Sequence, residues 1–190
     1  FLNGRNALNK YQKAGICSST SVFLTGIPKF DKYAKQVNTA SVVESLGICT
    51  NRLDSIRQTE EILEEVVENT NFRFNVSLRP HPSDERRDQW AELAADYGVD
   101  FSNAQDVDSF QFLSQMDAII AGASGIHLEA CLMNVVPIFF DFANIGSDRY
   151  GFVDNKLAIE GGSMKEIIVT LNRLFNEKPD VRERAKPFCE

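Results

Sequence analysis

Apolar residues recur along the chain with two different periods, which predict alternating helices and strands. From Asp54 to Val67, apolar residues recur every three or four positions with glutamates between them, as in an amphipathic helix. The segment Phe74–Arg79 alternates apolar and polar residues, the pattern of a strand. The segment Val135–Phe142 is almost wholly apolar, which predicts a strand buried on both faces of a sheet.

The remaining elements follow the same alternation. Further strands are predicted over Ser41–Gly47, Val99–Ser102 and Asp117–Ala121, and further helices over Ser83–Tyr97, Asp108–Gln115, Ser124–Met133 and Ser163–Asn176. Strands that alternate with helices at short spacing indicate βαβ units. The sequence therefore predicts an α/β, Rossmann-like domain over residues 41–190, with a parallel sheet and helices on both faces.

The first forty residues have a different, more polar character. A short helix is predicted over Asn6–Ala14, a strand over Ser21–Thr25, and a second helix beginning near Phe30. The chain begins with Phe1, and we expect it to be a piece of a longer protein. We expect residues 1–40 to be the remnant of a crossover between two domains and to pack less fully than the rest.

Charge and composition exclude several classes of function. The 190 residues carry 20 Lys and Arg against 27 Asp and Glu, a net charge of −7 that disfavours binding to nucleic acid. The longest apolar run, Val135–Phe140, is far shorter than the roughly 20 residues that cross a bilayer. Four cysteines without a Cys-x-x-Cys pair and two histidines predict no metal site.

Candidate ligand-binding residues follow the predicted strands, because parallel sheets bind ligands at the carboxyl ends of their strands. The segment Ala121–Ala130 leaves a strand through small residues and enters a helix, where Gly122, Gly125 and Ser124 suit a diphosphate. Glu129 lies five residues beyond Ser124, roughly 7 Å along a helix, where a carboxylate could accept both ribose hydroxyls. The alternative is a tight turn with an exposed helical glutamate.

Two other loops carry basic residues. Arg79 and His81 follow a strand in the segment Arg-Pro-His-Pro, whose prolines stiffen the loop, and this pair suits a phosphate oxygen or acid–base catalysis. The alternative is a surface histidine in a rigid turn. Arg52 follows the first strand of the regular region and could reach a phosphate or remain solvated. The sequence contains no Walker loop, GxGxxG, GxSxG or HExxH motif, which disfavours a nicotinamide enzyme.

Together these segments resemble the C-terminal half of a GT-B glycosyltransferase. The resemblance is strongest to bacterial capsule, surface-polysaccharide and teichoic-acid transferases and to the related UDP-N-acetylglucosamine 2-epimerases. It is carried by Leu24-Thr-Gly-Ile-Pro-Lys-Phe-Asp31, Arg79-Pro-His-Pro82 and Ala123-Ser-Gly-Ile-His-Leu-Glu129 followed by Asn134-Val-Val-Pro137. Each motif is short, and their order and spacing are more specific than any one of them.

The resemblance implies the roles of the candidate residues. His81, Ser124 and Gly125 would hold the donor diphosphate, with His81 catalytic, and Glu129 would hold the ribose. Arg52 aligns with a basic residue that follows the first strand of the epimerases, although this chain has Asn51 where they usually have His. Arg79 is a further residue expected to bind the donor nucleotide. The epimerases have an Asp-Ser-Gly-Gly segment and paired glutamates, whereas this chain has Ala123-Ser-Gly-Ile and Leu128-Glu129, which favours transfer over epimerisation.

The resulting hypothesis is a donor-binding domain that uses a nucleotide-sugar in bacterial surface polysaccharide synthesis, without a cofactor. Its expected partners are a glycan or lipid-linked acceptor and an N-terminal GT-B domain of the full-length protein, without which we expect the chain to be inactive. The expected location is cytoplasmic, with membrane association of the full-length protein left open. An epimerase and a non-catalytic module that binds a nucleotide or glycan are the alternatives.

Overall fold

A computed structural model of the chain describes residues 4–16, 21–68, 73–146 and 148–189. The helices are α1 (Arg5–Lys13), α2 (Asp31–Lys35), α3 (Ile56–Glu68), α4 (Arg87–Asp96), α5 (Ser109–Leu113), α6 (Ile126–Leu132), α7 (Met164–Asn176) and α8 (Lys186–Cys189), with 3₁₀ turns at Pro28–Phe30 and Arg182–Ala185. The strands are β1 (Ser45–Thr50), β2 (Asn75–Pro80), β3 (Asp100–Phe101), β4 (Ala118–Ala121), β5 (Val136–Phe139) and β6 (Ile159–Glu160).

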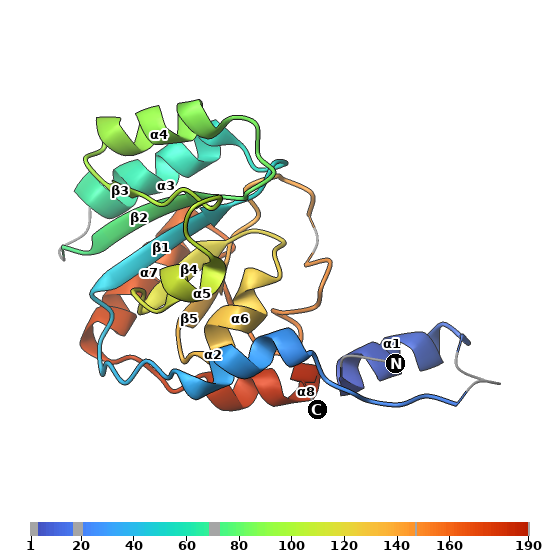
Figure 1. Cartoon of the computed structure of the whole chain (residues 1–190). Helices are drawn as coiled ribbons and strands as arrows, with labels where there is room; N and C mark the ends of the chain where they lie inside the picture. The colour runs from blue at the N-terminus through green and yellow to red at the C-terminus, as the bar shows by residue number, and fades with distance from the viewer. Residues whose placement is uncertain (1–3, 17–20, 69–72, 147, 190) are drawn as a thin grey trace.

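The described strands form one parallel sheet of six in the order β3-β2-β1-β4-β5-β6, which confirms the predicted Rossmann-like fold. Helices α3 and α7 contact each other on one face of this sheet, and α5 and α6 contact each other on the other (Figure 1). The chain runs outward from β1 to β3 and then returns to place β4 on the other side of β1. The carboxyl ends of β1 and β4 therefore form the topological switch point, where α/β sheets of this kind bind ligands.

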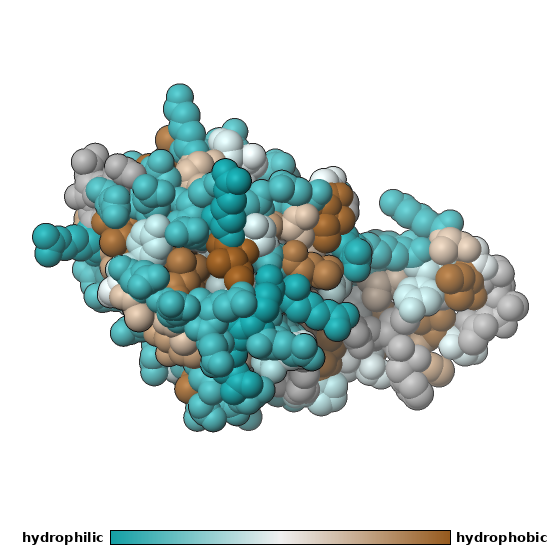
Figure 2. Space-filling view, turned by 90° about the horizontal axis from the view of Figure 1, so that it is seen from above, coloured by the Kyte–Doolittle hydropathy of each residue, from teal (hydrophilic) through white to brown (hydrophobic). Residues whose placement is uncertain are grey.

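The sheet is buried because helices cover both of its faces. Every residue of β4 and β5 is buried, and only Ser45 of β1 is partly exposed. The apolar stripe predicted in α3 packs inward through Ile62, Leu63 and Val66, while its glutamates remain at or near the surface. The view over α3 and α4 in Figure 2 is accordingly mostly hydrophilic. The strand predicted over Val135–Phe142 is buried as expected, although β1 and β4, not β5, occupy the centre.

Several predicted boundaries are wrong. The segment Ser21–Thr25 forms only an isolated bridge at Leu24, and β1 begins four residues later than predicted. The helices predicted from Ser83 and Ser124 begin at Arg87 and Ile126, because tight turns occupy the residues before them. Strand β6, the 3₁₀ turn at Arg182–Ala185 and α8 were not predicted.

The N-terminal region divides into an exposed arm and a segment that joins the core. Helix α1 projects from the domain in Figure 1 and contains no buried residue. In contrast, Phe30 and Tyr33 are 8% and 4% exposed and belong to the same hydrophobic core as the sheet. The boundary between residues 1–40 and 41–190 stays a prediction. Within the described ranges, no helix combines the length and apolar character needed to cross a bilayer.

Candidate functional site

A pocket of about 400 Å³ lies at the switch point, between the carboxyl ends of β1 and β2 and the start of α6. Five of the seven candidate residues line it: Arg79, His81, Ser124, Gly125 and Glu129. Its other lining residues are Cys49, Thr50, Pro80, Pro82, Ala104, Asp108, Ser109 and Ile126. The sheet register explains the convergence, because Cys49 pairs with both Arg79 and Ala121 and so aligns the ends of three strands.

His81 is exposed to this pocket on a rigid turn. Its Nδ1 accepts a hydrogen bond from the Ser83 backbone N–H at 3.2 Å and lies 2.8 Å from the Ser83 hydroxyl. Since Nδ1 accepts, Nε2 carries the proton of the neutral ring and can donate to a ligand. The turn is closed by the Asp84 N–H, which donates to the His81 carbonyl at 2.8 Å. Ser83 thus orients His81, where the sequence predicted a helix cap.

Because His81 is exposed, we expect His81→Ala to leave the folded domain intact. Surface substitutions away from special contacts change stability by about 0.5 kcal/mol or less. Urea denaturation followed by circular dichroism measures this, with Pro82→Ala as a control in the same turn. A loss above about 2 kcal/mol for His81→Ala alone would show that the ring supports the fold and would undermine a ligand-binding role.

The loop from β4 to α6 supplies the opposite wall. The Ser124 hydroxyl oxygen accepts from the Ile126 N–H at 3.4 Å, and the run of small residues ends at Gly125, where the helix begins. A Cβ atom on Gly125 would meet nothing within 4 Å, so the space above this residue is open to a ligand. Gly122 does not line the pocket. Its Cβ would lie 3.2 Å from Asp54 Oδ1, so this glycine makes room for a buried carboxylate.

Glu129 is half-buried on the first turn of α6 and lines the same pocket. The neighbouring wall is tied to α2: Lys32 Nζ donates to Asp108 at 2.9 Å, and the Tyr33 hydroxyl lies 2.7 Å from Ser109 Oγ. The bond from Lys32 holds the pKa of Asp108 below its usual value. These four residues were not predicted as site residues, because nothing in the local pattern links Lys32 and Tyr33 to the start of α5.

The two candidate arginines differ from expectation. Arg79 lines the pocket but is only 6% exposed, and its guanidinium donates to Ser102 Oγ at 2.9 Å and to the Val107 carbonyl at 2.7 Å. Its principal contacts therefore hold the loop between β3 and α5. Arg52 lies on the exposed turn between β1 and α3 and does not line the pocket.

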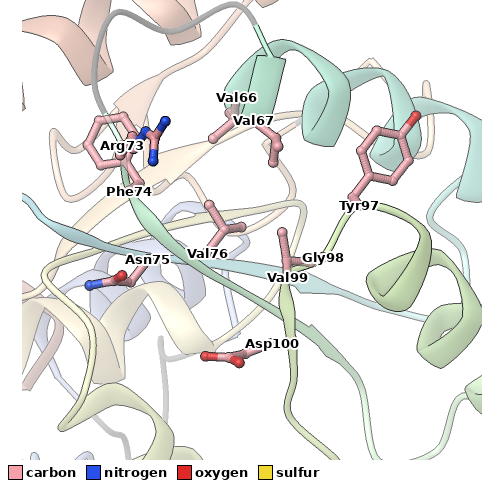
Figure 3. A pocket seen from close by; sticks show the side chains of 10 residues that line it. All are labelled: Val66, Val67, Arg73, Phe74, Asn75, Val76, Tyr97, Gly98, Val99 and Asp100. Carbon is pink, nitrogen blue, oxygen red and sulfur yellow. The ribbon is translucent and has the colours of Figure 1, made fainter.

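A pocket of about 450 Å³ lies at the opposite end of the strands (Figure 3). The side chains of Val66, Val67, Val76 and Val99 point into it from the end of α3 and the starts of β2 and β3, and Tyr97 borders it. It contains none of the candidate residues. The pocket that contains His81 and Glu129, the switch-point pocket, is the stronger candidate for a ligand site, because α/β sheets bind ligands at the switch point.

Comparison with known proteins gives likenesses of structure only. No protein-family model and no curated protein sequence matches the chain. Its structure is similar to Methanocaldococcus jannaschii UDP-GlcNAc 2-epimerase, solved with UDP-GlcNAc and UDP (TM-score 0.63, 16% identity, 98% of this chain and 58% of that one). It is also similar to the wall teichoic acid polymerase TagF, solved with CDPG (TM-score 0.60, 13% identity, 97% of this chain and 49% of that one). A further similar structure is S. aureus TarM, solved with UDP (TM-score 0.55, 16% identity, 93% of this chain and 37% of that one).

These likenesses confirm the fold implied by the sequence resemblance, that of the C-terminal half of GT-B proteins. The chain spans between 37% and 58% of the length of the three chains it matches.

Proposed function

We propose that this chain binds the nucleotide part of an activated sugar, as the donor-binding domain of a GT-B glycosyltransferase in bacterial surface polysaccharide synthesis. The observation that carries the proposal is the switch-point pocket, in which His81, Ser124, Gly125 and Glu129 lie together. Support comes from the similar structures solved with UDP, UDP-GlcNAc or CDPG.

In the proposed reaction, an acceptor hydroxyl oxygen forms a bond to the anomeric carbon of the sugar and gives its proton to a general base. The bond between the anomeric carbon and the phosphate oxygen breaks, and the leaving phosphate gains negative charge. His81 Nε2–H and the Ser124 hydroxyl donate hydrogen bonds to that phosphate. Donors held in place before the reaction stabilise such charge best, and the Ser83 contact fixes the His81 ring. The acceptor is a glycan or a lipid-linked group. Both the acceptor and the general base come from outside this domain, and the reaction takes place in the cytoplasm.

A nucleotide panel tests the binding step. We expect calorimetric titration of this chain to give saturable binding for at least one of UDP, CDP, GDP and CMP, and the bound nucleotide to raise the melting temperature by mass action. Absence of binding by all four compounds would contradict the proposal and favour a scaffold that has the same fold.

The role of Glu129 gives a more specific prediction. We expect Glu129→Ala to weaken binding of that nucleotide by about 1.5–3 kcal/mol, roughly tenfold to a hundredfold, because a carboxylate accepts two charge-assisted hydrogen bonds from the ribose hydroxyls. Glu129→Gln should lose less, and Glu64→Ala on exposed α3 is the matched control. A 2′,3′-dideoxy nucleotide should bind the wild type and Glu129→Ala about equally weakly. If it binds the wild type as well as its parent does, the ribose role is wrong.

The epimerase remains a second candidate because its structure gives a TM-score of 0.63 with this chain. Product analysis with the full-length protein separates the two: a transferase releases free nucleotide and lengthens a glycan, whereas an epimerase returns an altered sugar nucleotide.

A further inference from the structure

Arg86 joins two loops at the switch point that are far apart in sequence. Its Nη1 donates to the Asp54 carbonyl at 2.9 Å and its Nη2 to the Asn51 carbonyl at 3.2 Å, both in the turn between β1 and α3. Arg86 itself lies in the turn between β2 and α4, the one that carries His81. The guanidinium is therefore a direct link between these two turns.

A buried carboxylate fixes the guanidinium in that position. Asp84, whose side chain is 1% exposed, accepts from Arg86 Nε at 2.9 Å and from Nη2 at 2.7 Å. Asp84 also accepts from Trp90 Nε1 at 3.0 Å, and the Arg86 guanidinium lies over the Trp90 ring at 5.1 Å. Because a guanidinium and a carboxylate pair through two parallel hydrogen bonds, their relative orientation is fixed, whereas a lysine ammonium can pair with a carboxylate in several orientations.

The same carboxylate residue continues the link to His81. The Asp84 backbone N–H donates to the His81 carbonyl, closing the turn in which Ser83 orients the imidazole. Arg86 is therefore hydrogen-bonded to the β1–α3 turn and to the Asp84 carboxylate, and the Asp84 backbone in turn holds the His81 carbonyl.

We propose that Arg86 is a positioning residue for the ligand site, acting through His81. The inference rests on the proposed nucleotide binding but assigns the orientation of His81 to a residue outside the pocket. Arg86 itself does not line the pocket, so its effect on a ligand passes through the turns that it joins. Lysine cannot replace it, since one ammonium cannot pair with Asp84 in a fork and also reach both carbonyls.

A double-mutant cycle tests this role with UDP as the probe, measured by calorimetry at a temperature where circular dichroism shows every variant folded. We expect His81→Ala and Arg86→Met each to weaken UDP binding by about tenfold, and the double variant to bind about as weakly as either alone. If Arg86 only supports the fold, Arg86→Met should weaken UDP binding by the same factor in the wild type and in the His81→Ala variant. Arg86→Lys, which keeps a charge beside Asp84, should stay folded and still show the weaker binding and the same non-additivity.

Arg57→Met is the matched control, because Arg57 pairs only with Glu61 on exposed α3 among the described contacts, and it should leave UDP affinity unchanged. The positioning role is overturned if Arg86→Met and Arg86→Lys change the affinity by less than about twofold, or by the same factor with and without His81. If the wild type binds UDP, such a result leaves the proposed function standing. If the wild type binds none of UDP, CDP, GDP and CMP, the proposed function and the positioning role fall together.

Discussion

Asp84→Ala is expected to lower the free energy of unfolding by about 3 kcal/mol, the lower end of the usual cost of removing one partner from a buried ion pair, because the Arg86 side chain is 30% exposed. The substitution leaves Arg86 without its fork-shaped partner and Trp90 Nε1 without an acceptor, and Trp90 is fully buried. Urea denaturation at pH 7 measures the loss. At this chain length, 3 kcal/mol corresponds to a melting temperature lower by roughly 6–12 °C.

Two variants separate the buried pair from a general effect of lost charge. Asp88→Ala removes an exposed carboxylate from the first turn of α4 and should cost less than about 1 kcal/mol. Asp84→Asn keeps an acceptor for Trp90 and should fall between the two. If Asp84→Ala costs no more than Asp88→Ala, the described ion pair contributes little and Arg86 is held by other contacts.

The elements with a strong hydrophobic period were predictable from the sequence. The stripe of α3, the alternation of β2 and the apolar run of β5 each determine an element without help from distant residues, and all three lie where the pattern predicts. Short elements were not predictable in this way. Strand β6 has two residues and is defined by its pairing with β5, a contact that local sequence does not encode.

One predicted helix start was wrong because its capping residue has another partner. Ser83 looked like the cap of a helix after Pro82, but it contacts His81, and α4 begins only after Asp84 has closed a turn around Arg86. By contrast, Asp108 and Ser163 were predicted at the starts of helices and do cap them, accepting from the backbone N–H three residues on.

The pocket was largely predictable because parallel strands place the residues after them at one edge. That rule brings His81, Ser124, Gly125 and Glu129 together. It cannot tell which basic residue faces a ligand. Arg79 lines the pocket, but its guanidinium donates to Ser102 and to the Val107 carbonyl, and Arg52 lies outside the pocket. The link made by Arg86 depends on carbonyls about thirty residues earlier in the chain.

Asp54 should make the protein less stable at neutral pH. Burial raises the pKa of this carboxyl from 3.8 to about 6, and Asp141 adds to the effect, although the Asn51 N–H and Arg86 oppose it. Between about pH 4 and pH 6 the folded state holds a proton that the unfolded state has lost, so this group adds stability as the pH falls. Asp54→Asn should therefore stabilise the domain at pH 7 by about 1–3 kcal/mol, an advantage that disappears near pH 4.

His127 should act in the opposite direction over nearly the same range. Its ring is fully buried, Nε2 donates to the Gly122 carbonyl at 2.8 Å, and Nδ1 has no hydrogen-bond partner among the described residues. Burial lowers its pKa from 6.5 to about 4. Between those values the unfolded state takes up a proton that the folded state refuses, so stability is lost as the pH falls from 6.5 to 4, by up to about 3 kcal/mol.

The two groups flank the same residue, Gly122, and each variant should expose the effect of the other. In wild-type protein the opposing contributions offset each other between pH 4 and pH 6.5. The Asp54→Asn variant should lose stability as the pH falls. The His127→Gln variant, which keeps a donor for the Gly122 carbonyl, should gain stability as the pH falls. Urea denaturation at half-unit steps from pH 4 to pH 7 measures the free energy of unfolding of each protein. Subtracting the wild-type value at each pH removes the contribution of the other carboxylates. Parallel curves for all three proteins would mean that neither group is held away from its ordinary pKa, and that the loop before Ser124 is more open to water than its burial indicates.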